Sequence, residues 1–153
     1  MRIWSGAVIL VLGLGVGTAT TAAGKAGAQA AAEVSVAQHE MTMKSIAQAN
    51  QAMQKAIKSN ALADAGKQAK ELATLFGTVE RFWKQHNKAD AVKLVQTAAT
   101  VANEVAGAAA AGDQMKALMA AGNIGANCKQ CHGTYREGDQ ETGFNIKPGT
   151  ITQ

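Results

Sequence analysis

Hydrophobic residues recur along most of this chain at steps of three and four residues, the spacing that places side chains on one face of an α-helix. Four such segments can be read. They cover residues 33–58, 62–83 and 91–112, and a fourth begins at Asp113 and runs into a pair of cysteines. No segment shows the alternation typical of a β-strand.

Each segment has a set of expected interior positions. They are Val36, Met43, Ile46, Met53 and Ile57 in the first; Ala65, Ala69, Leu72, Phe76, Val79 and Trp83 in the second; Ala91, Leu94, Val95, Ala98, Val101, Ala102 and Val105 in the third; and Met115, Leu118 and Met119 in the fourth. Four apolar stripes joined by short polar breaks predict an all-α fold, an antiparallel four-helix bundle over residues 31–136.

Polar residues at the breaks predict where helices begin and end. Ser59 with Asn60, and Asn87 with Asp90, are placed to cap the second and third helices, and Asp113 is placed to cap the fourth. Gly112 is placed to end the third helix. Residues 137–153 are rich in turn formers and lack periodicity, so an irregular C-terminal tail is expected there.

The first 30 residues have the layout of a secretory signal peptide. Arg2 is followed by an apolar stretch over residues 7–16 and by a small-residue cleavage site, Ala28-Gln29-Ala30. The alternative is an uncleaved membrane anchor, but many Gly, Thr and Ala residues between Arg2 and Lys25 would make a poor span. We therefore expect export to the periplasm, with cleavage near Ala30 and no stable membrane insertion afterwards.

Charge argues against nucleic acid as a partner. The net charge of +4 includes Arg2 and Lys25; without these two, 13 Lys and Arg face 11 Asp and Glu, a net charge of +2. The remaining charges are interspersed rather than gathered into a basic patch. A chain of 153 residues with 4% aromatic residues and one proline fits one helical domain.

The only two cysteines, Cys128 and Cys131, are three residues apart, and His132 follows the second directly. A structural zinc site usually needs four ligands, and this motif offers at most three. A redox dithiol of the thioredoxin type would follow a strand at a helix start, and cysteines three apart on a helix are badly oriented for a disulfide. The spacing fits covalent haem c, with two thioethers to the porphyrin vinyl groups and His132 as an axial ligand of the iron.

The motif CKQCHGTYR on the last of four helices resembles the cytochrome c-prime family, the class II c-type cytochromes. The resemblance covers about residues 34–136, and its specific part is Cys128, Cys131, His132, Tyr135 and Arg136. It implies a haem between the first and fourth helices, with His132 as the proximal ligand. It also implies that Arg136 pairs with a haem propionate; the alternative is a solvated cation near a helix C-terminus.

Matching MQKAIK at residues 53–58 to the family pattern places Met43 on the other side of the iron, as in the methionine-ligated branch of the family. The alternative is that Met43 is a core residue. Where the family commonly has arginine, four residues earlier, this chain has His39. That difference puts the second propionate contact in doubt and leaves His39 as a further candidate near the iron.

These expectations describe a periplasmic one-electron carrier with redox partner proteins rather than an enzyme, since no nucleophile, general base or substrate pocket is evident. One alternative is a five-coordinate c-prime protein that binds nitric oxide or another small gas. Another is an exported helical protein without haem, whose Met and His residues bind copper or serve packing. The resemblance also leaves a homodimer open.

Overall fold

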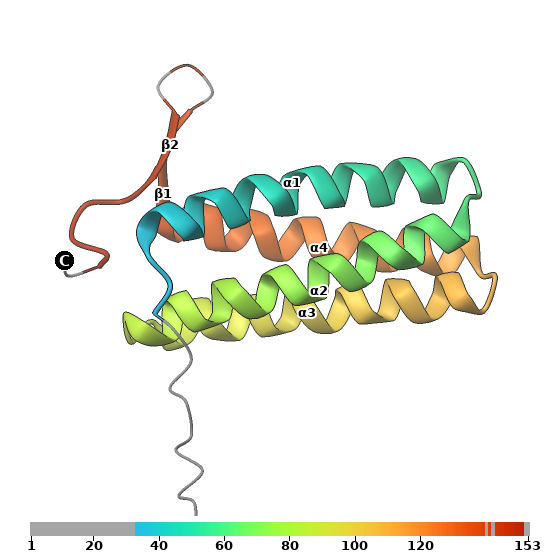
Figure 1. Cartoon of the computed structure of the whole chain (residues 1–153), viewed down its shortest axis with the longest axis horizontal. Coiled ribbons are helices and arrows are strands. Elements are labelled where there is room, and N and C mark those ends of the chain that lie inside the picture. The colour runs from blue at the N-terminus through green and yellow to red at the C-terminus, as the bar shows by residue number, and fades with distance from the viewer. Residues whose placement is uncertain (1–32, 140, 142, 152–153) are drawn as a thin grey trace, which may run out of the picture. The chain divides into compact units, whose positions relative to one another are not determined.

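The structure is a computed structural model in which residues 33–139, 141 and 143–151 are described. Four helices account for most of these residues: α1 (Val36–Lys58), α2 (Leu62–Gln85), α3 (Ala89–Ala110) and α4 (Gln114–Tyr135). Figure 1 shows them side by side and running alternately in opposite directions. The all-α prediction of four helices is therefore confirmed, whereas the predicted signal peptide and its cleavage site lie outside the described residues.

The three turns between helices share one backbone design. Asn60, Asn87 and Gly112 each adopt a positive φ, of 57°, 56° and 75°. After α1, the Asn60 N–H donates to the Ile57 carbonyl at 3.0 Å and the Ala61 N–H donates to the Ala56 carbonyl at 2.9 Å. This pair of bonds is the Schellman motif, and the same pattern follows α2 and α3.

The predicted roles of the break residues are partly wrong. Asn60 and Asn87 end the helices before them instead of capping the helices after them, because asparagine tolerates the left-handed conformation that the motif requires. Helices α2 and α3 have no side-chain N-cap bond. Gly112 ends α3 as predicted, and the Asp113 carboxylate accepts from the Lys116 N–H at 2.9 Å, which confirms the cap on α4.

Helix α2 supplies four of the eight largest fully buried side chains among the described residues, Trp83, Phe82, Leu72 and Val79. All six expected interior positions of α2 are buried, together with Phe82, whose side chain is fully enclosed. In α1 the interior face is displaced from the expected one: Ile46, Met53 and Ile57 are buried, but so are His39 and Thr42. Val36 is exposed and Met43 is half-buried.

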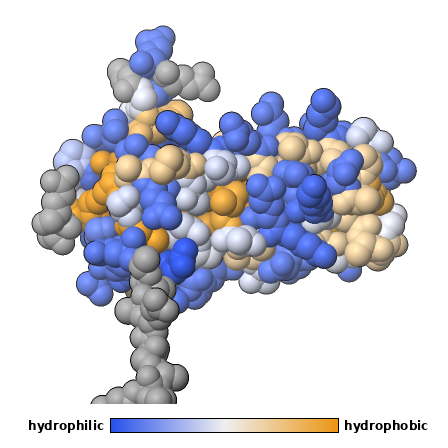
Figure 2. Space-filling model, in the orientation of Figure 1, coloured by the Kyte–Doolittle hydropathy of each residue, from blue (hydrophilic) through white to orange (hydrophobic). Residues whose placement is uncertain are grey.

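The expected interior face of α4 is wrong. Met115, Leu118 and Met119 are 66%, 43% and 68% exposed. The residues that α4 buries are small, apart from one isoleucine, and they are Ala117, Ala120, Ala121, Ile124 and Cys131. Alanines let α4 approach its neighbours closely, and the larger apolar side chains lie outside. On the face drawn in Figure 2, hydrophobic residues appear as patches among hydrophilic ones.

The four helices do not pack against one another equally. Helix α2 lies close to α1 and α3 along its length, and α3 lies close to α4. Helices α1 and α4 also meet, but far less extensively. The side of the bundle between α1 and α4 is therefore its most loosely packed side.

The residues after α4 are not an irregular tail, which corrects the prediction for this segment. Strands β1 (Arg136–Asp139) and β2 (Gly143–Ile146) pair as an antiparallel hairpin, with Arg136 opposite Ile146. Gly138 has a φ of +83°, and an added Cβ would collide with the carbonyl oxygen of Gly143. The Lys147 side chain then returns to α4 and donates to the Gly133 carbonyl at 2.8 Å. The hairpin is thus fixed to the end of the helix that carries the cysteines.

None of the helices in the described part of the chain combines the length and the hydropathy needed to cross a membrane.

Candidate functional site

Cys128, Cys131 and His132 lie in the last two turns of α4, so their spacing is set by regular helix geometry. Cys131 is buried, Cys128 and His132 are half-buried, and both thiols are free. The helix ends just beyond them, where the Arg136 N–H donates to the His132 carbonyl. The motif residues are therefore presented on one short, well-ordered segment at the end of the bundle.

Burial keeps the two thiols protonated. It raises the pKa of Cys128, and it raises the pKa of Cys131 to about 11, with help from the nearby negative charges of Cys128 and Asp90. A redox dithiol needs the opposite shift, and it obtains that shift at a helix N-terminus rather than at the C-terminal end where this motif lies. The environment of these cysteines is thus unlike that of a thioredoxin-type site.

A zinc site is not assembled either. No group of three or more His, Cys, Asp or Glu side chains suited to a metal ion occurs within residues 33–139, 141 and 143–151. A haem iron requires only one or two protein ligands in addition to the porphyrin nitrogens, so this finding does not bear on haem.

An aromatic cluster joins three helices beside the motif. It consists of His39 from α1, Phe82 and Trp83 from α2, His86 at the end of α2, and Tyr135 from α4. The rings of His39 and Phe82 are stacked, with centroids 4.1 Å apart, and the Trp83 and Tyr135 centroids are 4.8 Å apart. The cluster therefore connects α1 to the end of α4 through α2.

Helix α3 reaches the same region through a polar contact. The Tyr135 hydroxyl is hydrogen-bonded to the Asp90 carboxylate, and this bond lowers the pKa of Asp90. Burial, together with the same bond, raises the pKa of Tyr135 to about 12. All four helices thus contribute to the end of the bundle that holds Cys131 and His132.

His39 is the most unusual member of the aromatic cluster. It is 5% exposed, and its Nδ1 is buried without a hydrogen-bond partner. Burial, together with the positive charges of His132 and His86, lowers its pKa to about 4. Burial and the charge of Arg136 also lower the pKa of His132. Sequence analysis named His39 as a departure from a family pattern and as a further candidate near the iron, but not as an interior residue; its spacing of seven from buried Ile46 and fourteen from buried Met53 would have shown that it faces the interior.

Met43 lies beside the interior face of α1 rather than on it. Its side chain is half-buried and packs against the edge of the core, one turn after His39. His39 is therefore more deeply buried than Met43.

Arg136 is held by the hairpin. Its guanidinium carbon lies 3.9 Å from the centroid of the Phe144 ring, a cation–π geometry. Phe144 itself is 44% exposed. Arg136 remains close enough to His132 to affect its pKa, so its positive charge stays beside the motif while its side chain stacks on β2.

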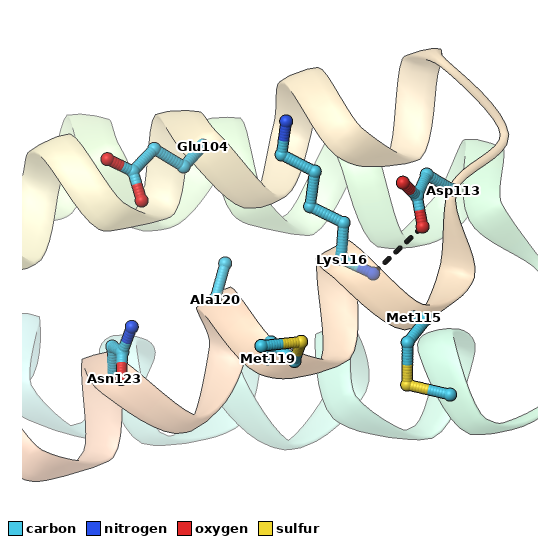
Figure 3. A pocket seen from close by; sticks show the side chains of 7 residues that line it. All are labelled: Glu104, Asp113, Met115, Lys116, Met119, Ala120 and Asn123. Atoms are coloured by element: carbon cyan, nitrogen blue, oxygen red, sulfur yellow. Dashed lines mark hydrogen bonds between the residues drawn. The ribbon is translucent and has the colours of Figure 1, made fainter.

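The open groove drawn in Figure 3 lies elsewhere. It runs between α3 and the first half of α4, where Met115 and Met119 line it together with Glu104 and Lys116. Its lining residue nearest to the motif is Asn123, five residues before Cys128, and neither cysteine nor His132 lines it. The groove therefore does not belong to the cysteine motif.

The residues around the motif fit a covalently attached haem in three respects. Cys128 and Cys131 are one turn apart and protonated, with His132 adjacent on the same helix. Helix α4, which carries them, packs far less extensively against α1 than against α3. A buried imidazole nitrogen without a partner, His39 Nδ1, lies on α1, and its ring is linked to the end of α4 through Trp83 and Tyr135.

No protein-family model, curated protein or solved structure shows significant similarity to this chain.

Proposed function

We propose that the protein is a periplasmic c-type cytochrome that carries one electron at a time between redox partner proteins. The observation that carries this proposal is the arrangement of Cys128, Cys131 and His132 on the last two turns of α4, beside the aromatic cluster that joins α1, α2 and α4. Covalent haem is the interpretation of the motif that gives a role to all three residues. The resemblance to the cytochrome c-prime family, drawn from the same motif and its place on the fourth helix, supports it.

The two thiols would attach the group. Each S–H would add across one vinyl C=C of the porphyrin, so that the S–H bond and the π bond are replaced by a C–S bond and a C–H bond. The reaction transfers no electrons overall, so no oxidant or reductant is consumed. Because burial holds Cys128 and Cys131 as thiols, both the sulfur and the hydrogen that the addition needs are present.

The bound haem would supply the Fe(III)/Fe(II) couple, and the chain would supply its ligands and surroundings. His132 would hold the iron through an imidazole nitrogen. Burial lowers the pKa of His132, which favours the neutral form that a ligand requires. The resemblance assigns the opposite side to a residue of α1, Met43.

Surrounding residues would set the environment of the iron. Phe82, Trp83 and Tyr135 place apolar rings next to the motif, and such a shell limits water access and influences the potential. Arg136 adds a positive charge beside His132 and is available to a propionate. These residues bind and shield, and none of them is arranged as a nucleophile or general base, so the proposed role is that of a carrier.

Covalent attachment is the direct test. The full chain would be produced in a periplasm that contains a c-type haem-maturation system, and the mature protein would be separated by denaturing electrophoresis and stained for haem. We expect a stained band with one haem per chain. Cys128→Ala with Cys131→Ala should abolish the stain, whereas Met115→Ala, a change on the exposed part of the same helix, should retain it. A wild-type band without haem would overturn the proposal.

A further inference from the structure

The interior of α1 carries a histidine at the end of the bundle where the cysteine motif lies. His39 contacts Trp83 with ring centroids 5.6 Å apart, and Trp83 contacts Tyr135, which follows His132 by three residues on α4. The two histidines thus lie at the same level of the bundle, on the two helices that pack least tightly against each other.

Burial of His39 has no explanation within the fold itself. Its side chain is 95% buried, since only 5% of its surface is exposed, and no described residue satisfies its Nδ1. A buried polar atom without a partner costs about 1–3 kcal/mol. Stacking on Phe82 accounts for the position of the ring but gives Nδ1 no partner. A ligand that accepts a nitrogen lone pair would remove this cost.

The other two buried atoms without partners in the described residues are not suited to binding a metal beside the motif. Trp83 Nε1 is a donor without a lone pair in the ring plane, and Asn50 Oδ1 lies three turns along α1 from His39. An imidazole, in contrast, is the commonest protein ligand for metals and binds iron through either nitrogen.

Met43 is less well placed than His39 for the same role. It lies one turn further along α1 and is only half-buried at the flank of the helix, whereas His39 lies on the face that points into the bundle. Since one residue of α1 can occupy the side of the iron opposite His132, the two compete for a single position.

We propose that His39, and not Met43, is the axial ligand opposite His132, so that the haem iron is held by two histidines from α1 and α4. This inference rests on the proposed function, because it presupposes haem attached at Cys128 and Cys131. It changes the chemical class of the site. Methionine with histidine raises the reduction potential, whereas a second imidazole lacks the sulfur that favours the ferrous state. The carrier would therefore work at a lower potential than a methionine-ligated one and would serve lower-potential partners.

The test uses the haem-loaded full chain and compares absorption and electron paramagnetic resonance spectra of the wild type with those of His39→Ala, Met43→Leu and His86→Ala. His86 is a matched control, since it is another histidine that contacts Phe82. We expect a low-spin wild type without the far-red sulfur-to-iron band. Met43→Leu and His86→Ala should keep that spectrum. His39→Ala should convert to high spin, and added imidazole should restore the low-spin form.

Two outcomes would overturn the inference and leave the proposed function intact. One is a sulfur-to-iron band in the wild type that Met43→Leu loses and His39→Ala keeps. The other is a high-spin wild type, which would mean an open, five-coordinate iron suited to gas binding. The wild-type spectrum decides between these cases even if His39→Ala fails to fold. A wild type without covalent haem would instead overturn the proposed function, and the inference with it.

Discussion

The buried state of His39 predicts that the haem-free chain loses stability in mild acid. This chain can be prepared as the Cys128→Ala, Cys131→Ala double variant, in which the thioethers cannot form. In the unfolded chain His39 has an ordinary pKa of 6.5, while burial lowers the pKa in the folded chain to about 4. Between these values the unfolded chain binds a proton that the folded chain does not, so the free energy of unfolding falls as the pH falls.

The size of the effect follows from the two pKa values. One pKa unit corresponds to ~1.4 kcal/mol, so the full loss, reached below the folded pKa, is about 3 kcal/mol. Most of it, about 2 kcal/mol, should appear between about pH 7 and pH 5. His132 adds to the loss with the same sign, because its pKa is also lowered. The carboxylates of Glu80 and Asp90 do not titrate above about pH 5, because their pKa values lie below the ordinary values of 4.5 and 3.8. They therefore do not contribute to the loss of stability in this pH range.

Urea denaturation followed by circular dichroism at a series of pH values measures the slope directly. His39→Leu in the haem-free background should remove most of the slope, whatever its effect on stability at neutral pH. Met43→Leu, one turn away and without a titrating group, should leave the slope unchanged. A free energy of unfolding that stays level from pH 7 to pH 5 would show that His39 is not buried in the way described, and the argument built on it would fail.

Three further changes test other parts of the structure. Asn60→Ser should cost about 1 kcal/mol in urea denaturation while Asn60→Gly should cost nothing, because the position is left-handed; equal stability of serine and asparagine would indicate an N-cap instead. Gly138→Ala should disrupt the hairpin, seen as loss of amide protection over β1 and β2, without lowering the melting temperature of the helices; an intact hairpin would contradict its close approach to the Gly143 carbonyl. Tyr135→Phe should raise the pKa of Asp90 toward its ordinary value, measured by carboxyl NMR titration, and an unchanged pKa would show that the tyrosine hydrogen bond is absent.

The sequence predicted the helices of this protein better than it predicted their faces. Helix α2 was read correctly because large apolar residues such as Leu72 and Phe76 mark its interior. Helix α4 was misread because its interior is built from alanines, while Met115 and Met119 lie in solvent. A pattern that weights large apolar residues finds the wrong side of a helix when close packing requires small ones.

The candidate site shows a related limit. The spacing of Cys128, Cys131 and His132 is local, so the sequence alone could predict it. The burial of His39 depends on how α1 packs against α2, which is not a local property of the sequence. A search for apolar residues at helical spacing also leaves out a histidine, because histidine is polar. The hairpin was not predicted, for a different reason: β1 and β2 are almost wholly exposed, so they carry no alternation of apolar and polar residues.

The three short turns have a consequence for the order of folding. Each joins neighbouring helices through three residues, so the contacts of α1 with α2, α2 with α3 and α3 with α4 close small loops. The α1–α4 side has no turn across it, and its contacts join the parts of the bundle that are farthest apart in sequence. Closing such a loop has the largest entropic cost, so these contacts form late and open first. A flat ligand would therefore enter most readily between α1 and α4, after the other three helix pairs are in place.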